Sequence, residues 1–317
     1  MWTVVACLVP PLVLSVFIFG VQTLLITAVS VASCVAMEAI SQKALGRRVT
    51  ISDGSAVITG MLIAFVIPPG VSFLLPVLGA VMAIYIGKHL LGGIGYNIFN
   101  PALLARAFLL ATFPVAMTSA WIAPNNTLFT FLGTTVDSVS SATPLAVMKE
   151  QGLEAFQAQF GTASNIYTNF FVGIQPGSIG ETSALLILLG GLYLMYKGYI
   201  TWHIPVSTLA SIAALTWAFG GDVYFSGDPL LAILTGGAML GAFFMANDYV
   251  TCPTNKTAQL VYGFGIGLLT VLIRLKGGYP EGICYAILLM NPVSSVLDTM
   301  FKPKRFAPLA PPPGGGK

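Results

Sequence analysis

The sequence predicts an all-α polytopic membrane protein with about ten transmembrane segments. Charged residues make up only 8% of the 317 residues and hydrophobic residues 56%, and the mean hydropathy is +0.86. A soluble domain carries about 25% charged residues, so this chain has too few charges to cover a surface that faces water. Apolar runs of helix-spanning length also recur from Val4 to Val296.

The apolar runs form two groups of five. They cover residues 3–19, 21–41, 55–67, 71–87 and 99–116, and then residues 184–196, 204–219, 229–246, 257–273 and 282–299. Segments 55–67 and 184–196 are too short to cross about 30 Å of hydrocarbon unaided, so we expect broken or tilted half-helices there. Short segments interrupted by Gly or Pro, in matching places of two halves, indicate a binding site near the bilayer midplane.

The first segment, from Trp2 to Phe19, contains Pro10 and Pro11. A signal peptide would have a basic region before it and a small-residue cleavage site after it, and neither is evident. We therefore interpret it as the first transmembrane helix. Because a short polar leader is expected before such a helix, Met1 need not be the native start.

The two groups of segments resemble each other. Thr59-Gly60-Met61-Leu62 has a counterpart in residues 235–240, and Lys88 with the glycine-rich residues 92–96 parallels Lys276 with residues 277–282. Five spans per group is an odd number, so a second copy must be inverted in the membrane. Glycine-rich strings also recur by chance, but the order and context of both matches favour an inverted repeat.

Lys and Arg set the expected orientation. With the N-terminus inside, the inside segments hold Lys43, Arg47, Arg48, Lys88, Lys197, Lys256, Lys302, Lys304 and Arg305, and the outside keeps Lys149, Arg274 and Lys276. This bias predicts that both termini are inside. The expected organisation is a first repeat (1–116), an external loop (117–183), a second repeat (184–300) and a Pro- and Gly-rich cytoplasmic tail (301–317), which we expect to be disordered.

Composition argues against several classes of partner. The net charge is only +3, and no basic patch interleaved with aromatic residues is present, so no nucleic-acid partner is predicted. The four cysteines lie far apart, at Cys7, Cys34, Cys252 and Cys284. Without a Cys-x-x-Cys motif, and with only two histidines, we expect no iron–sulfur, zinc or haem site, and we predict no metal ligands.

A heptapeptide in the external loop carries the main functional motif. It reads Asp137-Ser138-Val139-Ser140-Ser141-Ala142-Thr143 and is followed by Pro144. It resembles the Asp-x-x-Ser-Gly-Ala-Thr signature at which membrane redox pumps carry an FMN, joined as a phosphoester to the threonine hydroxyl. Ser141 stands where the signature has Gly.

The heptapeptide has two interpretations. As a flavin signature, it makes Thr143 the attachment residue and Asp137, Ser140, Ser141 and Ala142 its recognition sequence. The alternative is that Thr143 is a helix N-cap with proline at the first helical position. Asp137 six residues earlier and the position in the long external loop favour the flavin.

Longer motifs carry a resemblance over nearly all of the chain. They are residues 53–56, 92–102, 176–183, 241–248 and 274–282. With them the chain resembles the family that comprises the D subunits of Rnf complexes and the B subunits of sodium-pumping NADH:quinone reductases. The lack of a long N-terminal extension favours the Rnf branch. The resemblance implies two inverted five-helix repeats with a fold similar to urea transporters.

The resemblance also implies a function. Such a subunit belongs to a redox-driven Na⁺ or H⁺ pump in a bacterial or archaeal cytoplasmic membrane, and it carries electrons through a covalent FMN between reduced ferredoxin and NAD⁺. It is not catalytically complete alone. The implied partners are the other Rnf subunits (A, B, C, E and G), a flavin transferase and membrane lipid. A second, non-covalent flavin, riboflavin, is associated with the wider family.

Two other functional classes are compatible with the predicted architecture. An inverted-repeat channel or small-solute transporter has no use for an attachment threonine, and a structural anchor has no use for intramembrane carboxylates. The flavin motif and the acidic residues therefore favour the redox pump. We predict no catalytic side chain in this subunit.

Three carboxylates in or beside the spans are candidates for ion handling. Glu38, Asp248 and Asp298 match acidic residues of the family tied to cation handling, and ionisable groups in a membrane are functional candidates by default. The alternative is that each is solvated at the interface or paired with a nearby lysine, namely Lys43, Lys256 or Lys302. Asp248 precedes Tyr249, where the family has Pro.

A glycine-rich break before Pro101 offers a second flavin site. Asn97 and Asn100 have amides that suit the edge of an isoalloxazine ring or a ribityl chain, and Gly92 and Gly93 would let a ring approach closely. The alternative is that Asn100 simply caps the next helix.

Overall fold

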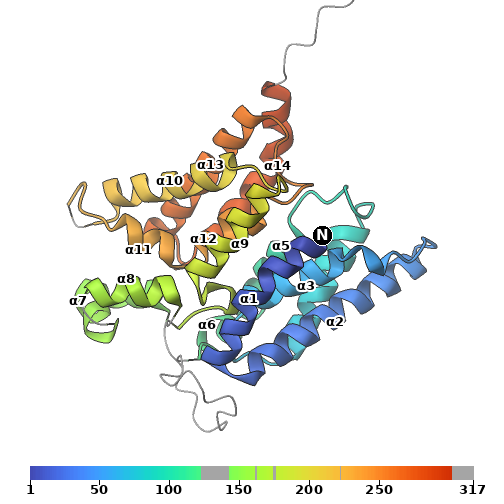
Figure 1. Ribbon diagram of the computed structural model, residues 1–317, viewed down its shortest axis with the longest axis horizontal. Coiled ribbons are helices and arrows are strands. Elements are labelled where there is room, and N and C mark those ends of the chain that lie inside the picture. The colour runs from blue at the N-terminus through green and yellow to red at the C-terminus, as the bar shows by residue number, and fades with distance from the viewer. Residues whose placement is uncertain (123–142, 161–162, 174–175, 222, 302–317) are drawn as a thin grey trace, which may run out of the picture.

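The computed structural model describes residues 1–122, 143–160, 163–173, 176–221 and 223–301 (Figure 1). This part of the chain contains fourteen α-helices and no β-strand, so the all-helical prediction is confirmed. Four residues of the predicted flavin signature, Asp137, Ser140, Ser141 and Ala142, and most of the predicted tail lie outside the described residues.

The first half of the chain begins with a helical hairpin that turns at Gly20, whose φ is 86°. Its elements are α1 (Trp2–Phe19), α2 (Val21–Ala44), η1 (Ile51–Asp53), α3 (Ser55–Phe65), α4 (Leu74–Ala80), the π-helical η2 (Val81–His89), α5 (Pro101–Thr112) and α6 (Pro114–Ser119). The Pro68-Pro69 pair follows α3 and prevents its continuation.

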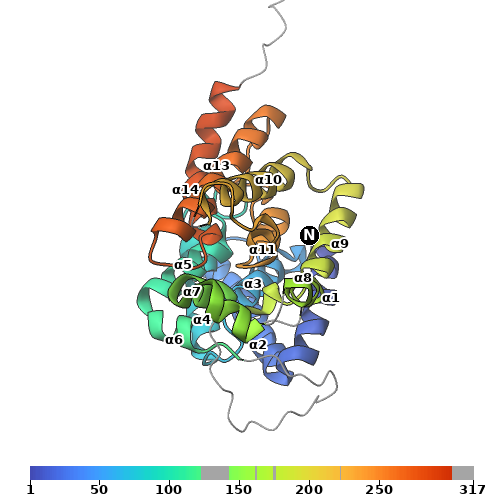
Figure 2. The same ribbon diagram turned by 90° about the vertical axis from the view of Figure 1, so that its left-hand side faces the viewer.

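The second half of the chain is also helical in its described residues. Its elements are α7 (Pro144–Phe160), α8 (Ala163–Val172), η3 (Ile179–Glu181), α9 (Ala184–Tyr196), α10 (His203–Phe219), α11 (Pro229–Leu234), α12 (Ala238–Leu240), the π-helical η4 (Gly241–Met245), α13 (Lys256–Lys276) and α14 (Ile283–Met300). Figure 2 brings α7, α8 and α11 towards the viewer.

Among the described residues, α1, α2, α13 and α14 are long and apolar enough to cross a membrane, and five further apolar helices are shorter. Segment 55–67 is a short helix, as expected. Segment 184–196 is likewise a short helix, α9. The second break lies in segment 229–246, because Gly236 and Gly237 have φ values of 65° and 64° and interrupt the helix there.

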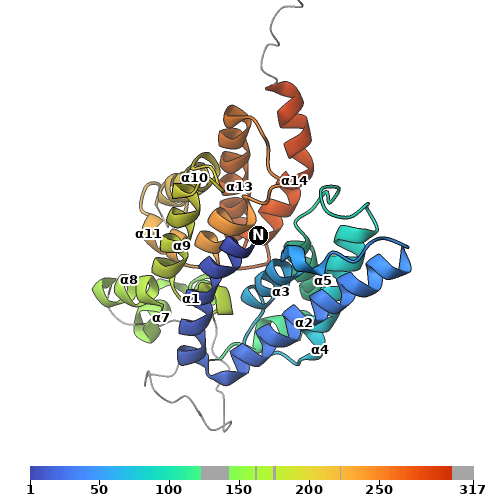
Figure 3. The same cartoon turned by 45° about the vertical axis from the view of Figure 1, so that its right-hand side comes forward.

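Small residues allow the closest helix contacts. A Cβ on Gly263 of α13 would lie 2.8 Å from Ile204 O on α10, and one on Gly60 of α3 would lie 2.6 Å from the Cα of Val31 on α2. Helix association in lipid depends on such close van der Waals packing. Helix α1 contacts both α2 and α9, so the two halves interleave (Figure 3).

Each half contains one π-helical segment after a short α-helix. The amide of Leu90 donates to Tyr85 O at 2.8 Å, and the amide of Ala246 donates to Gly241 O at 2.8 Å. Such wide turns occur often at functional sites, since they redirect the side chains that follow. Both π-helical segments border the cavity described next.

Candidate functional site

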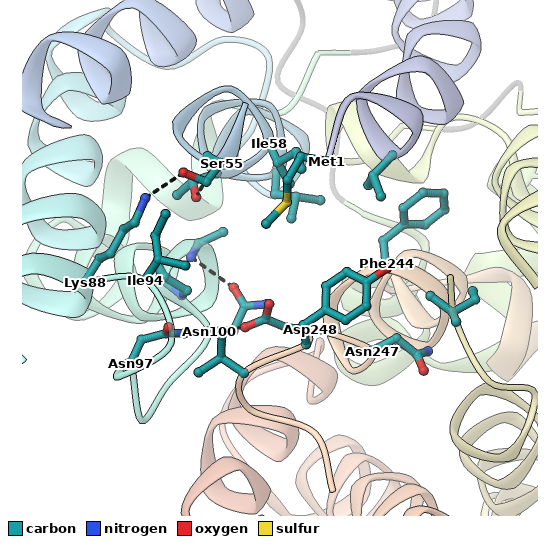
Figure 4. Close-up of a pocket in the computed structure, with 18 of the residues that line it drawn as sticks. Met1, Ser55, Ile58, Lys88, Ile94, Asn97, Asn100, Phe244, Asn247 and Asp248 are labelled. Carbon is teal, nitrogen blue, oxygen red and sulfur yellow. Dashed lines mark hydrogen bonds between the residues drawn. The ribbon is translucent and has the colours of Figure 1, made fainter. Parts of the chain in front are cut away.

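A cavity lies between the two halves, where the start of α3, the end of η2 and the loop before α5 meet η4. Its polar lining consists of Ser55, Thr59, Lys88, Asn97, Asn100, Asn247, Asp248 and Tyr249. Figure 4 shows Asn97, Asn100 and Asp248 along one edge, with Ile58 and Phe244 on the walls. The sequence therefore predicted three polar lining residues of one cavity, although Asp248 was assigned to ion handling and the asparagines to flavin.

Asn100 has a structural role in this cavity. Its Oδ1 accepts hydrogen bonds from the amides of Ala102 (3.0 Å) and Leu103 (3.4 Å), which caps α5. Its Nδ2 donates to Met245 O at 3.1 Å, across the interface between the halves. The capping interpretation of Asn100 is confirmed, and the same side chain joins the two halves.

Asn97 and Asp248 face each other across the interface between the halves. The Asn97 Nδ2 donates to Phe99 O at 3.3 Å and to Asp248 Oδ2 at 3.5 Å. Asp248 also accepts from Thr251 Oγ1 at 3.3 Å. These bonds are at the long end of the usual range. The Asp248 carboxylate also accepts from the backbone amides of Tyr249 and Val250, so the Asn97 amide is the less firmly held of the two groups.

Glu38 does not line the cavity itself but forms an ion pair with Lys88, which does. Its fully buried carboxylate accepts from Lys88 Nζ at 2.6 Å and from Gln42 Nε2 at 3.2 Å. The Lys88 ammonium, itself buried, donates to Ser55 Oγ at 2.7 Å. The partner of Glu38 is therefore a lysine from η2, not the neighbouring Lys43.

Gly92 and Gly93 do not line the cavity. Their φ values are 132° and 104°, and Cβ atoms there would lie 3.0 Å from Tyr96 Cβ and 3.1 Å from Arg47 Nη1. The Arg47 guanidinium also donates to Gly92 O at 2.6 Å. The positive φ values of the two glycines set the shape of the loop that carries Asn97. We expected a flavin ring to approach these glycines, but they do not line the cavity.

Asp298 holds the start of α13. Its carboxylate accepts from the amides of Thr254, at 3.0 and 3.1 Å, and Asn255, at 3.2 Å, and from Thr254 Oγ1. It does not line the cavity. The Asp298 carboxylate thus already accepts hydrogen bonds from backbone amides.

Thr143 lies in a second, smaller niche. Its side chain is buried, and Oγ1 accepts a hydrogen bond from the Ala146 amide at 3.3 Å, so Thr143 is the N-cap of α7. Glu181, Thr235, Gly236 and Glu281 line the same niche. The two sites lie at opposite ends of α3: Ser55 at its start lines the cavity, and Phe65 at its end contacts Gly180, beside the niche.

The segment that follows Thr143 is attached to later parts of the second half. Lys149 Nζ donates to Gly277 O and, at 3.2 Å, to Tyr279 O. Tyr167 of α8 donates to Asp228, and this hydrogen bond raises the pKa of the Tyr167 hydroxyl to about 12. Tyr167 therefore stays a protonated donor at neutral pH, and α7 and α8 are fixed over α11 and α13.

Sequence reasoning missed a buried charge cluster beside the niche. Arg106 of α5 forms an ion pair with Glu281, and both side chains are more than 90% buried. Arg274 also interacts electrostatically with Glu281 and with Glu181. The available signal was Arg106 itself, an ionisable residue inside the apolar run 99–116.

Comparison with known proteins identifies the family of the chain. The sequence model of the NQR2, RnfD, RnfE family matches residues 1–307. The chain is 44% identical over 307 residues to the D subunit of a proton-translocating ferredoxin:NAD⁺ oxidoreductase complex from Clostridium ljungdahlii, covering 96% of this chain and 90% of that protein.

Two further relatives extend this comparison. The D subunit of the Na⁺-translocating ferredoxin:NAD⁺ oxidoreductase complex from Acetobacterium woodii is 42% identical, covering 96% of this chain and 89% of that protein. The D subunit of an ion-translocating oxidoreductase complex from Stutzerimonas stutzeri is 37% identical, covering 94% and 89%. The chain belongs to the NQR2, RnfD, RnfE family.

Proposed function

We propose that this chain is the D subunit of an ion-translocating ferredoxin:NAD⁺ oxidoreductase, and that it carries electrons through an FMN esterified to Thr143. The observation that carries the proposal is 44% identity to a D subunit over 96% of the chain, together with the heptapeptide that ends in Thr143. The partners are the other subunits of such a complex (A, B, C, E and G), the flavin transferase that matures the chain, and lipid.

The surroundings of Thr143 fit an attached phosphoester. The hydroxyl lies at the first turn of α7, where free backbone amides and the helix dipole favour a phosphate. The carboxylates of Glu181 and Glu281 in the niche oppose such a charge. Arg106, paired with Glu281, and Arg274, which donates to Thr235 O at 3.0 Å, offset them.

The attachment reaction is balanced with FAD as donor. The Thr143 oxygen forms a bond to the FMN phosphorus, the bond between the two FAD phosphates breaks, AMP leaves and the hydroxyl proton is released. When bound, the flavin supplies transfer of one or two electrons. The chain holds the phosphoester and orients it at the start of α7.

The cavity between the halves suits the second, non-covalent flavin, riboflavin. Its edge of amides from Asn97 and Asn100 can hydrogen-bond a ring or a ribityl chain, and Ile58 and Phe244 provide apolar walls. The cation Lys88 lies on the same lining. Glu38 and Asp248 next to this cavity, and Asp298 at α13, are the proposed groups for Na⁺ or H⁺ handling.

The proposed topology has ten membrane segments in two inverted repeats, with both termini in the cytoplasm. The segment 229–246 counts as one broken crossing, made by α11, α12 and η4. Thr143 then faces outwards, and the cavity with Asn97 faces the cytoplasm. The chain is expected in the cytoplasmic membrane.

The attachment is tested by in-gel flavin fluorescence after SDS denaturation, with the chain co-expressed with its transferase. We expect fluorescence in the wild type and none in Thr143→Ala or Thr143→Asn. Asparagine preserves the N-cap, so the second variant separates a missing hydroxyl from a frayed helix. Thr118→Ala, an exposed threonine on α6, is the matched control and keeps the signal.

Fluorescence in Thr143→Asn, or its absence in the wild type while the transferase labels a control substrate, would overturn the attachment. The channel or small-solute transporter would then be the better explanation of the architecture.

Replacement of Asn97 tests the non-covalent site. Asn97→Leu should lower the riboflavin content of the purified complex about tenfold, since one hydrogen bond to a ligand is worth about 1 kcal/mol or more and the leucine also desolvates the edge. The content is measured by chromatography of the flavin released on denaturation. Asn169→Leu, on α8 and away from the cavity, is the control, and equal loss in both variants would contradict the site.

A further inference from the structure

A second cavity lies next to the niche of Thr143. Leu145 lines both the niche and this cavity, so the cavity begins two residues after the proposed attachment point. Met148 and Lys149 of α7 form one side, and Asp228, Ala232 and Arg274 of the second half form the other. A group tethered to Thr143 therefore has a lined space within reach.

The lining combines apolar walls with two cations that form no ion pair within the described residues. Arg274 donates from Nη1 to Ala232 O at 2.7 Å and from Nη2 to Thr235 O at 3.0 Å, which are neutral carbonyls. Its buried Nε has no hydrogen-bond partner within the described part of the chain. Lys149 likewise donates to carbonyls, those of Gly277 and Tyr279.

The one carboxylate on the lining is already engaged. Asp228 accepts from the Leu231 amide at 3.1 Å, which caps α11, and from Tyr167. A buried donor without a partner is destabilising, and a ligand with acceptor atoms would relieve this cost. The cavity therefore fits a group with apolar faces and an electron-rich edge.

We propose that this second cavity receives the isoalloxazine ring of the flavin attached to Thr143, with the pyrimidine edge towards Arg274 and Lys149. The inference rests on the proposed attachment. N1 and the C2 carbonyl of that edge are acceptors, which suit the free Nε of Arg274. Cations at this edge favour the reduced flavin, because reduction adds negative charge to the ring.

The first test measures the midpoint potential of the Thr143 flavin in the purified complex. In Lys149→Gln we expect the preference for the reduced over the oxidised flavin to fall about tenfold, which is about 30 mV for a two-electron couple. Lys276→Gln is the matched control, because this lysine is exposed at the end of α13 and does not line the cavity. The flavin potential in this variant should equal that of the wild type.

A second test fills the cavity without removing charge. In Ala232→Phe the ring is expected to be displaced, so quenching of flavin fluorescence by iodide should rise at least threefold. Leu230→Phe, an exposed residue of the same helix, is the control and should match the wild type.

In-gel fluorescence after SDS is recorded for every variant. Covalent fluorescence with unchanged potential in Lys149→Gln and unchanged quenching in Ala232→Phe would overturn the cavity while leaving the attachment intact. Loss of covalent fluorescence in the wild type would overturn the attachment, and the cavity with it.

Discussion

Lys88→Met is expected to lower the free energy of unfolding by about 3–5 kcal/mol, because it leaves the buried Glu38 carboxylate without its cation. Glu38 is fully buried, and its Oε1 lies 2.6 Å from Lys88 Nζ. After the change, Gln42 Nε2 at 3.2 Å is the closest remaining donor. Reversible unfolding of the detergent-solubilised protein in SDS measures the effect.

The double variant Glu38→Met/Lys88→Met should recover most of that loss. Replacing both members of a buried ion pair by apolar side chains is often neutral, since no uncompensated charge remains. Lys43→Met is the control on the same helix as Glu38, because Lys43 is exposed, and it should stay within about 0.5 kcal/mol of the wild type. A Lys88→Met protein as stable as the wild type would contradict the buried pair.

The double variant also separates folding from ion handling. If Glu38 serves the proposed ion path, the folded double variant should accumulate less Na⁺ or H⁺ in vesicles for each electron pair transferred. If the pair is only structural, the double variant should pump like the wild type. The comparison is informative because both proteins are expected to be folded.

The sequence could predict the elements that depend on local composition. The apolar runs correspond to helices, and Pro68-Pro69 follows the end of α3 as expected. It could also predict Asn100 as a cap, since Asn before Pro101 is a local signal. These features need no knowledge of which helices meet.

Pairings across the fold could not be predicted. Asn97 and Asp248 are 151 residues apart, and Arg106 and Glu281 are 175 apart. Local patterns do not encode such distances, so Lys88 could not be recognised as the partner of Glu38. The closer Lys43 was the reasonable expectation from sequence separation alone.

The glycine motifs that suggested a repeat show a second limit of prediction from sequence. Gly60 and the glycines of residues 235–240 were paired by their letters, yet they have different roles. Gly236 and Gly237 have positive φ values and break the helix, whereas Gly60 lies inside α3 and allows contact with α2. Residues that match by their letters therefore need not have matching conformations.

Gly60→Ala is the second large effect that we expect. The new Cβ would lie 2.6 Å from Val31 Cα and 3.0 Å from Ser30 O, which are backbone atoms that cannot turn away. Overpacking of this kind costs about 1–3 kcal/mol or more. Alanine gains about 1 kcal/mol of helix propensity over glycine, so a clear net loss remains, and Gly60→Leu should prevent accumulation of folded protein.

The matched control is Gly278→Ala, because a Cβ there meets no atom within 4 Å and its φ is not left-handed. Its unfolding free energy should stay within about 0.5 kcal/mol of the wild type. Separation of α2 from α3 would also break the hydrogen bond from Ser30 Oγ to Gly60 O at 2.7 Å. Since Ser55 at the start of α3 lines the cavity, Gly60→Ala should lower riboflavin content as well as stability. A loss of stability with full riboflavin content would mean that the cavity does not depend on the position of α3.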